Sequence, residues 1–582
     1  MATGPGNTLT LDMAGSEGKI LKAAGTLTLN AFGFFQVTGG FAIEQRDQAV
    51  TLSAATNAQG VQTAAPTTVN ARLLTIGASN VRAFAGINGG TADQVGLELT
   101  GANFGLALVS EVAGNGGVVG TPRKWTSLEA TAQQVALVGM PEGLTLQAND
   151  IKVQINRASQ VVPAGAKAAV VDYAAGATAM TVATGPSSGI AFDMPGANGA
   201  MLTATGNLTL DAFGFVQVTG GFAVEKRSTT VTLAATRTLP AQSLAVDVLT
   251  FGMDNVTVFA GVNGGTADAA GLRIAGIDLA LALVTSQAEP GRKWTALQAN
   301  ATSAGFVGLS DLLPTIRNLS VELNQASRAN DRVIDFSAAP LTVLIGPGQT
   351  VDIDIDGAAG ELVRVEGDIT LQLFDFAYLS GRIGFEKYSP TAPITLATAT
   401  GVPQQVTATS MLAITGQGVS VFVGYADGGF DTSKTPDQQA GNLYGFGVSS
   451  ADFGILIAKA GGQSYTAAKA NLAHVALYGF DPNDFELSAS DLQLEINRAD
   501  ANGRSIDFVR SFGAGGLVLG STGAIALDFR GGDRIGVFAR EAVLKVSDFL
   551  YFRGAIGFQK ADFGNTLRAG NNGLTPVLGA KG

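Results

Sequence analysis

The stretch that decides the fold is residues 27–44, LTLNAFGFFQVTGGFAIE. Its apolar side chains fall at every second position, at 27, 29, 35, 37, 41 and 43. A period of two residues is typical of a β-strand that has one buried face. We therefore expect β structure here, with these apolar side chains on the buried face.

The same pattern returns along the chain, at 208–225, at 369–386 and, more loosely, at 543–559. An aspartate followed by glycines precedes the copies, at Asp12, Asp193, Asp354 and, less completely, Asp528. Self-similarity at a long fixed period is the signature of a repeat architecture. The sequence therefore predicts three complete units, residues 1–192, 193–353 and 354–527, and the opening of a fourth, 528–582.

Clusters of Gly, Asn, Asp and Ser separate the strand-like segments at intervals of roughly ten residues, as in all-β folds. Helix signals are nearly absent. Two all-β architectures fit: each unit as a closed β-sandwich with its own core, or an elongated β-solenoid-like stack that shares one core. We favour the stack, because no Pro/Ser-rich or charged linker separates one unit from the next.

Composition excludes several classes of protein. The chain has 582 residues with 46% hydrophobic and 14% charged residues and a net charge of −11, which argues against disorder and against nucleic acid as a partner. It has no cysteine, so disulfides and thiol chemistry are excluded. The longest apolar runs, such as 279–284, fall far short of the ~20 residues of a membrane-spanning helix. A single histidine, His474, leaves little general-base chemistry, so we expect no catalytic residues and no enzyme.

A glycine-rich turn is the candidate metal site. The sequence NGGTAD occurs at 88–93 and again at 263–268, and a variant, DGGFD, occurs at 427–431. Oxygen ligands on such a turn suit a hard cation, so calcium is the one cofactor that we consider. Asn-Gly turns also close hairpins without any ion. The candidate ligands are Asn88, Asp93, Asn263, Asp268, Asp427 and Asp431.

Two tryptophans are the candidate glycan contacts. Trp125 and Trp294 each follow an Arg-Lys pair, and an aromatic ring flanked by cations can recognise a ligand by stacking. The alternative is that both rings pack in the core under the Arg and Lys stems.

The repeat style resembles a known group of proteins. Units rich in Gly, Ala, Thr and Val, with TGGFAIE at 38–44 and NRAS at 156–159, resemble the tandem modules of giant bacterial secreted or surface proteins, the adhesin-like, RTX-associated proteins. The resemblance implies an extracellular or cell-surface location, a stalk-like or matrix role and calcium dependence. The string GNLTL at 206–210 is also similar to the β-groove of bacterial lipid-transport proteins.

Our leading expectation is a non-enzymatic structural element that acts as stalk, matrix or filament and associates with itself or with neighbouring units. The first alternative is a carbohydrate- or calcium-binding adhesin module, with glycans as partners. The second is an apolar β-groove that carries lipid, which the high hydrophobicity suggests. A polysaccharide enzyme that uses two carboxylates comes last.

Overall fold

The computed structural model describes most of the chain. The residues that it describes are 1–561, apart from 12, 32–34, 58–60, 113–121, 161, 164–165, 175, 177, 237–238, 309–313, 329–330, 374, 390–392, 399–400 and 524, together with 567–568 and 576–577. Asp12, the first of the repeated aspartates, lies outside the described residues.

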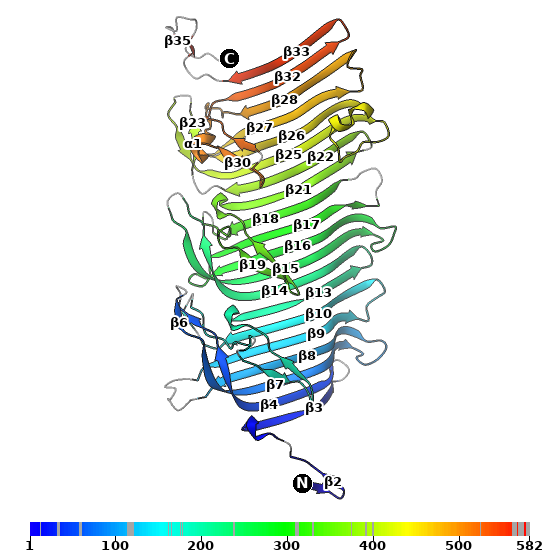
Figure 1. Ribbon diagram of the computed structural model, residues 1–582, viewed down its shortest axis with the longest axis vertical. Helices are drawn as coiled ribbons and strands as arrows, with labels where there is room; N and C mark the ends of the chain where they lie inside the picture. Colours follow the sequence, from blue (N-terminus) through cyan, green and yellow to red (C-terminus); the bar gives the residue numbers. More distant parts are fainter. Residues whose placement is uncertain are drawn as a thin grey trace.

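Twenty long strands form one antiparallel sheet in which each strand pairs with the next long strand of the chain (Figure 1). The first unit supplies β3 (Ile20–Ala31), β4 (Phe35–Leu52), β7 (Thr67–Ile87), β8 (Val95–Glu111), β9 (Lys124–Val138) and β10 (Leu144–Ala158). The second supplies β13 (Met201–Ala212), β14 (Val216–Leu233), β15 (Gln242–Val262), β16 (Ala270–Ser286), β17 (Lys293–Val307) and β18 (Thr315–Ala326). The third supplies β21 (Glu361–Leu373), β22 (Ala377–Ser389), β25 (Ala408–Ala426), β26 (Leu443–Ala460), β27 (Gln463–Tyr478) and β28 (Phe485–Asn497), and β32 (Arg534–Val546) and β33 (Leu550–Ala561) follow.

The remaining elements are short. The short strands are β1 (Ala2–Gly4), β2 (Asn7–Thr8), β5 (Ala55–Thr56), β6 (Gln62–Ala64), β11 (Thr181–Ala183), β12 (Gly189–Ala191), β19 (Leu341–Gly346), β20 (Gln349–Ile353), β23 (Ile394–Ala397), β24 (Gln404–Val406), β29 (Ser505–Ile506), β30 (Leu517–Leu519), β31 (Ile525–Leu527), β34 (Leu567–Arg568) and β35 (Pro576–Val577). The helical turns are η1 (Gly15–Glu17), η2 (Gly196–Asn198), η3 (Gly357–Ala359), η4 (Pro436–Asn442) and α1 (Phe508–Phe512).

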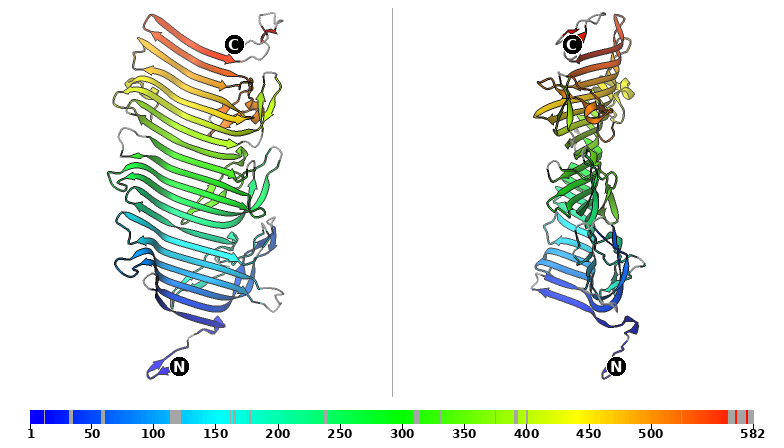
Figure 2. Two further views of the ribbon diagram at one scale, coloured as in Figure 1. Left: turned by 180° about the vertical axis from the view of Figure 1, so that it is seen from behind. Right: turned by 90° about the vertical axis from the view of Figure 1, so that its left-hand side faces the viewer.

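The all-β expectation is confirmed, but the β-solenoid-like stack is not. Neighbouring long strands are antiparallel, whereas a solenoid of coils stacks parallel strands. Separate sandwiches are not seen either, because the last strand of one unit pairs directly with the first strand of the next, as β10 does with β13. Among the described residues, β3 pairs only with β4 and β33 only with β32, so the sheet is open and elongated (Figure 2).

One face of the sheet, which we call the covered face, lies under hairpins. After its sixth strand each unit returns across this face as β11–β12, β19–β20 or β30–β31 (Figure 1). Glycine permits the close approach: a Cβ on Gly77 would lie 2.1 Å from the carbonyl oxygen of Ala183, and one on Gly252 would lie 2.2 Å from that of Leu344. The main apolar clusters therefore lie between this face and the returning segments.

A buried asparagine repeats in all three units and ties each returning segment to the sheet. The side-chain amides of Asn156 and Asn324 each donate a hydrogen bond of 2.7 Å, to the carbonyls of Val171 and Ile334. Asn497 donates to the carbonyl of Ile506 at 3.1 Å. Burial makes such bonds costly to lose, so they fix where each segment lies.

Candidate functional site

The opposite face of the sheet, which we call the apolar face, is lined by hydrophobic side chains along its whole length. Cross-strand partners project from the same side of a sheet, so the register gives its rows. One row runs from Leu210 through Val218 and Val258 to Ile274. The exposed large side chains of this face are Leu21, Leu27, Leu29, Phe41, Ile43, Ile87, Leu97, Leu108, Leu146, Leu202, Val216, Phe251, Met253, Val262, Leu272, Leu283, Phe306, Phe385, Leu412, Val423, Tyr425, Tyr444, Phe446, Ile457, Leu487, Val537, Val546, Leu550, Phe552, Ile556 and Phe558.

Away from the strand ends, the apolar face carries no charged side chain. Among the described residues that project from it there, none is Asp, Glu, Lys or Arg. Some strand residues have a left-handed backbone conformation, and their polar side chains form hydrogen bonds on the covered face instead. Asn318, for example, has φ 50° and donates to Asp368. The interruptions therefore leave the apolar face uncharged.

The expectation that the apolar side chains of residues 27–44 are buried is wrong. Leu27 and Leu29 are each 49% exposed, and Phe41 and Ile43 are 36% and 39% exposed. The hairpins cover the other side of these strands, where Ala42 is buried. The alternation correctly predicted strands, but the apolar side is the one that the protein leaves open.

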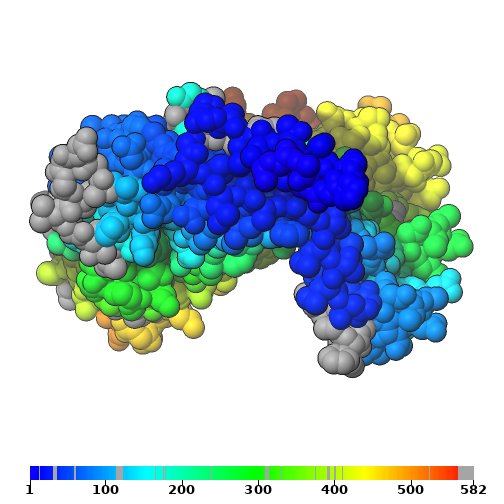
Figure 3. Space-filling view, turned by 90° about the horizontal axis from the view of Figure 1, so that it is seen from below, coloured from blue at the N-terminus to red at the C-terminus, as the bar shows by residue number. Residues whose placement is uncertain are grey.

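The apolar face is hollowed along the molecule. In Figure 2 (left) the sheet is seen from behind, with the hairpins on its far side. Viewed from below, the molecule is hollowed on the side that lies at the back of Figure 1, away from these hairpins (Figure 3). Near its C-terminal end the face carries an open hollow of about 400 Å³ lined by Phe446, Leu477, Leu487, Leu544, Phe552 and Ile556.

The uncovered area is much larger than a monomer normally exposes. From Val224 to Val216 along β14 is eight residues, or about 26 Å at ~3.3 Å per residue. Twenty such strands lie side by side. Exposed apolar patches beyond a few hundred Å² mark sites of association with other molecules. This face is therefore the candidate functional site.

The covered face holds the acidic side chains. Burial raises the pKa of Glu129, of Glu225 and of Glu322, and each has a cation within reach, such as Lys152 at 3.0 Å from Glu129. Arg364 pairs with Glu322 at 2.8 Å. The acidic and basic side chains of the covered face therefore pair with one another.

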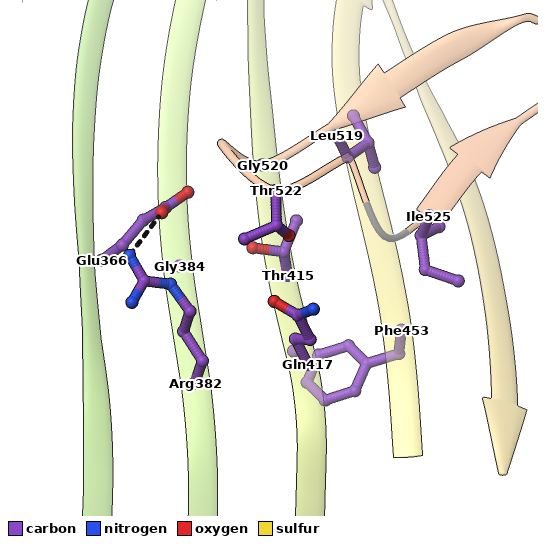
Figure 4. A pocket seen from close by; sticks show the side chains of 11 residues that line it. Glu366, Arg382, Gly384, Thr415, Gln417, Phe453, Leu519, Gly520, Thr522 and Ile525 are labelled. Carbon is purple, nitrogen blue, oxygen red and sulfur yellow. Dashed lines mark hydrogen bonds and ion pairs between the residues drawn. The ribbon is translucent and has the colours of Figure 1, made fainter. Parts of the chain in front are cut away.

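The hollow beneath the β30–β31 hairpin on the covered face is too small for a ligand (Figure 4). Its volume is about 10 Å³, which is the room that one water needs. Arg382 pairs with Glu366 at 3.2 Å in its wall, and the backbone N–H of Ser521 donates to the same carboxylate at 2.8 Å. These contacts hold the β30–β31 hairpin against the sheet.

His474 also lies on the covered face. Its Nδ1 is 2.6 Å from Oδ1 of Asp437, which also accepts a bond of 2.6 Å from the hydroxyl of Tyr478. Burial works against ionisation of Asp437, but these two bonds lower its pKa. The cluster supports η4 on β26 and β27.

The candidate calcium ligands lie in exposed turns at the ends of the strands. The amide of Asn88 donates to the backbone carbonyl of Asp93 at 3.3 Å, and Asn263 and Asp268 form the same bond at 3.4 Å. Among the described residues no group of three or more His, Cys, Asp or Glu is placed to hold a metal ion. The third turn is held by different bonds.

In that turn, the backbone N–H of Asp427 donates to the carbonyl of Asn442 at 2.8 Å. Hydrogen bonds from Ser433 hold the pKa of Asp431 at about 2, and Lys434 pairs with its carboxylate at 3.1 Å. Calcium binding at the three turns stays a prediction.

Both tryptophans are enclosed. Trp125 and Trp294 are 2% and 1% exposed, and each indole N–H donates at 2.8 Å to a carbonyl of the returning segment, Ala169 or Arg332. The guanidinium of Arg292 lies 5.0 Å from the Trp294 ring. The geometry leaves no open ring face for a sugar, so it agrees with the packing alternative.

Comparison with known proteins adds little. No family model matches the chain, and no curated protein matches it. One solved structure, described as the copper transporter OprC, matches over 93% of this chain and 78% of that one, with 11% identity and a TM-score of 0.19. A likeness this weak carries no argument. Among the described helices, none has the length and apolarity needed to cross a membrane.

Proposed function

We propose that this protein is a non-enzymatic β-repeat scaffold whose apolar face carries lipid acyl chains. The observation that supports the proposal is an uncharged, hollowed face, about eight residues wide on β14, that continues across every unit boundary. Apolar ligand sites in proteins are concave and lined by hydrophobic and aromatic side chains. Burying acyl chains there would remove apolar surface from water at about 25 cal/mol per Å².

A second copy of the chain fits this face less well. Packed sheets interdigitate at a spacing of about 10 Å, which requires two surfaces that meet closely. Two faces hollowed in the same sense meet at their rims and leave a space between them. Flexible acyl chains can fill a hollow of this kind without a matching surface.

The dimensions also suit lipid. One leaflet of a bilayer holds about 15 Å of hydrocarbon, half of the ~30 Å core. From Val224 to Val216 a strand offers about 26 Å of apolar face, at ~3.3 Å per residue. A chain that enters from either rim therefore stays on apolar side chains for its whole length.

Lipid uptake from vesicles tests the proposal. The full chain is mixed with vesicles that contain self-quenched fluorescent phosphatidylcholine, and dequenching is followed. We expect saturable uptake of more than one lipid per chain, inhibited by oleate but not by glycerophosphocholine, which has no acyl chains. Absence of transfer, or inhibition by glycerophosphocholine, would contradict the proposal.

The scaffold role is part of the same proposal. A sheet that adds six strands per unit without a break can span a long distance. The open edges of β3 and β33 offer unpaired backbone groups for self-association. The extracellular location and the stalk, matrix or filament role remain predictions that accompany it.

A further inference from the structure

A row of basic side chains borders one long side of the apolar face. Its members project from the same side of the sheet as the apolar residues, at the strand ends from which the hairpins emerge. The row consists of Arg72, Lys124, Arg157, Lys226, Lys293, Lys387, Lys459, Arg498 and Lys560. All nine are exposed, which is unexpected in a chain of net charge −11.

Acidic side chains do not neutralise the basic row. Four acidic residues lie at this end of the face: Asp47, Asp247, Glu361 and Asp533, which is 3.6 Å from Arg498. Asp47 is occupied by Arg72 at 3.4 Å. Asp247 accepts hydrogen bonds from the side chains of Ser228 and Gln287. The nine cations of the row therefore outnumber the four acids along this side.

Three lysines of the row repeat at one position of the units. Each of them directly follows a copy of the 27–44 stretch, on the second strand of its unit: Lys226 in unit two, Lys387 in unit three and Lys560 in unit four. Unit one has Gln45 at this position. None of the ion pairs between described residues includes any of the three. On β14 and β22 the row directly adjoins apolar side chains, since Lys226 pairs with Leu249 and Lys387 with Leu412.

The opposite long side of the apolar face has the opposite charge. The turns there carry Glu142, Asp93, Asp268, Asp375, Asp427, Asp431, Asp481, Asp484 and Asp548. Lys434 is the one cation in the described turns of that side, and it pairs with Asp431. An amphiphile on this face thus meets cations at one end and acids at the other.

We propose that the basic row binds the anionic headgroups of the lipids whose acyl chains lie on the apolar face. This inference rests on the proposed function and adds the class of lipid and its direction. The phosphate lies at the Lys and Arg side chains, and the acyl chains run from there along the strands. Basic residues favour an anionic lipid surface by about 1 kcal/mol each, and acidic turns disfavour the reverse orientation.

The test compares three fluorescent lipids with the same acyl chains: phosphatidylglycerol, which is anionic, phosphatidylcholine, which is zwitterionic, and diacylglycerol, which has no phosphate. We expect the protein to take up phosphatidylglycerol about tenfold more tightly than phosphatidylcholine at low salt. The preference should shrink as salt rises, because these cations are exposed.

Matched variants distinguish an effect of the basic row from a general effect of net charge. Lys226→Glu, Lys387→Glu and Lys560→Glu together should abolish the preference for phosphatidylglycerol and leave diacylglycerol uptake unchanged. The control is Lys22→Glu, Lys434→Glu and Lys545→Glu, which changes the net charge equally without altering the basic row. This control should keep the preference.

Three results would overturn the inference. The first is equal uptake of the two phospholipids by the unchanged protein. The second is a preference that survives in the row variant or is lost equally in the control. The third is sedimentation of the protein with phosphatidylglycerol vesicles while the lipid stays in the bilayer, which indicates a membrane-surface site. If no lipid is taken up, diacylglycerol included, the proposed function itself fails, and this inference fails with it.

Discussion

Replacement of Phe251, Phe385 and Phe446 together by aspartate should reduce lipid uptake by the full chain at least about tenfold. The three rings project from the apolar face in the second and third units and are 37%, 48% and 47% exposed. An aspartate at each position would place a carboxylate against acyl chains, where its loss of hydration is uncompensated. Uptake is measured with fluorescent diacylglycerol, so that headgroup charge does not contribute.

The fold should survive this change, because the side chains are already half exposed and surface substitutions usually alter stability by less than about 0.5 kcal/mol. The control variant carries Phe215→Asp, Phe376→Asp and Phe549→Asp. These rings are 57%, 57% and 92% exposed in turns at the strand ends. If the control loses as much uptake as the apolar-face variant, the effect is one of charge or folding and not of the face.

Trp294→Ala should weaken the attachment of the β19–β20 hairpin by about 3–5 kcal/mol. The ring is 1% exposed, and its N–H bonds the returning segment at Arg332. Removal leaves a cavity between β17 and that segment and an unpaired carbonyl. Hydrogen exchange followed by mass spectrometry should show residues 333–353 exchanging at least about a hundredfold faster.

Unit one provides the internal reference for this measurement. Trp125 holds its own returning segment through Ala169, and peptides around it should keep their protection. Phe549→Ala, at a 92% exposed ring, should leave exchange unchanged throughout. Unaltered protection of 333–353 in the Trp294 variant would show that the indole is not what holds the hairpin.

The sequence was enough to predict strands and turns, because these depend on local pattern. The alternation in residues 27–44 predicts β3 and β4, and the repeated NGG turns lie between β7 and β8 and between β15 and β16. Periodicity, however, reports only that one side of a strand is apolar. It does not say whether protein or another molecule covers that side, which is why Leu27 and Phe41 were expected to be buried.

The site could not be predicted for the same reason. Parts of the covered face consist of small and polar residues such as Gly77 and Thr75, which look solvent-facing in the sequence but lie under a hairpin. The basic row is spread over eight strands and the residue that follows β28, and only the register brings Lys226 and Lys293 to one side. The recurrence of lysine after Glu225 and Glu386 was a local signal that could have indicated it.

Native mass spectrometry of the full chain, purified without detergent, tests the central claim most directly. The account predicts chains that carry several lipid-sized masses, which collisional activation removes as phospholipid, with anionic species enriched. Lipid-free chains that remain soluble as monomers would contradict it. Lipid-free oligomers would do so as well, because the apolar face would then be covered by other copies of the chain.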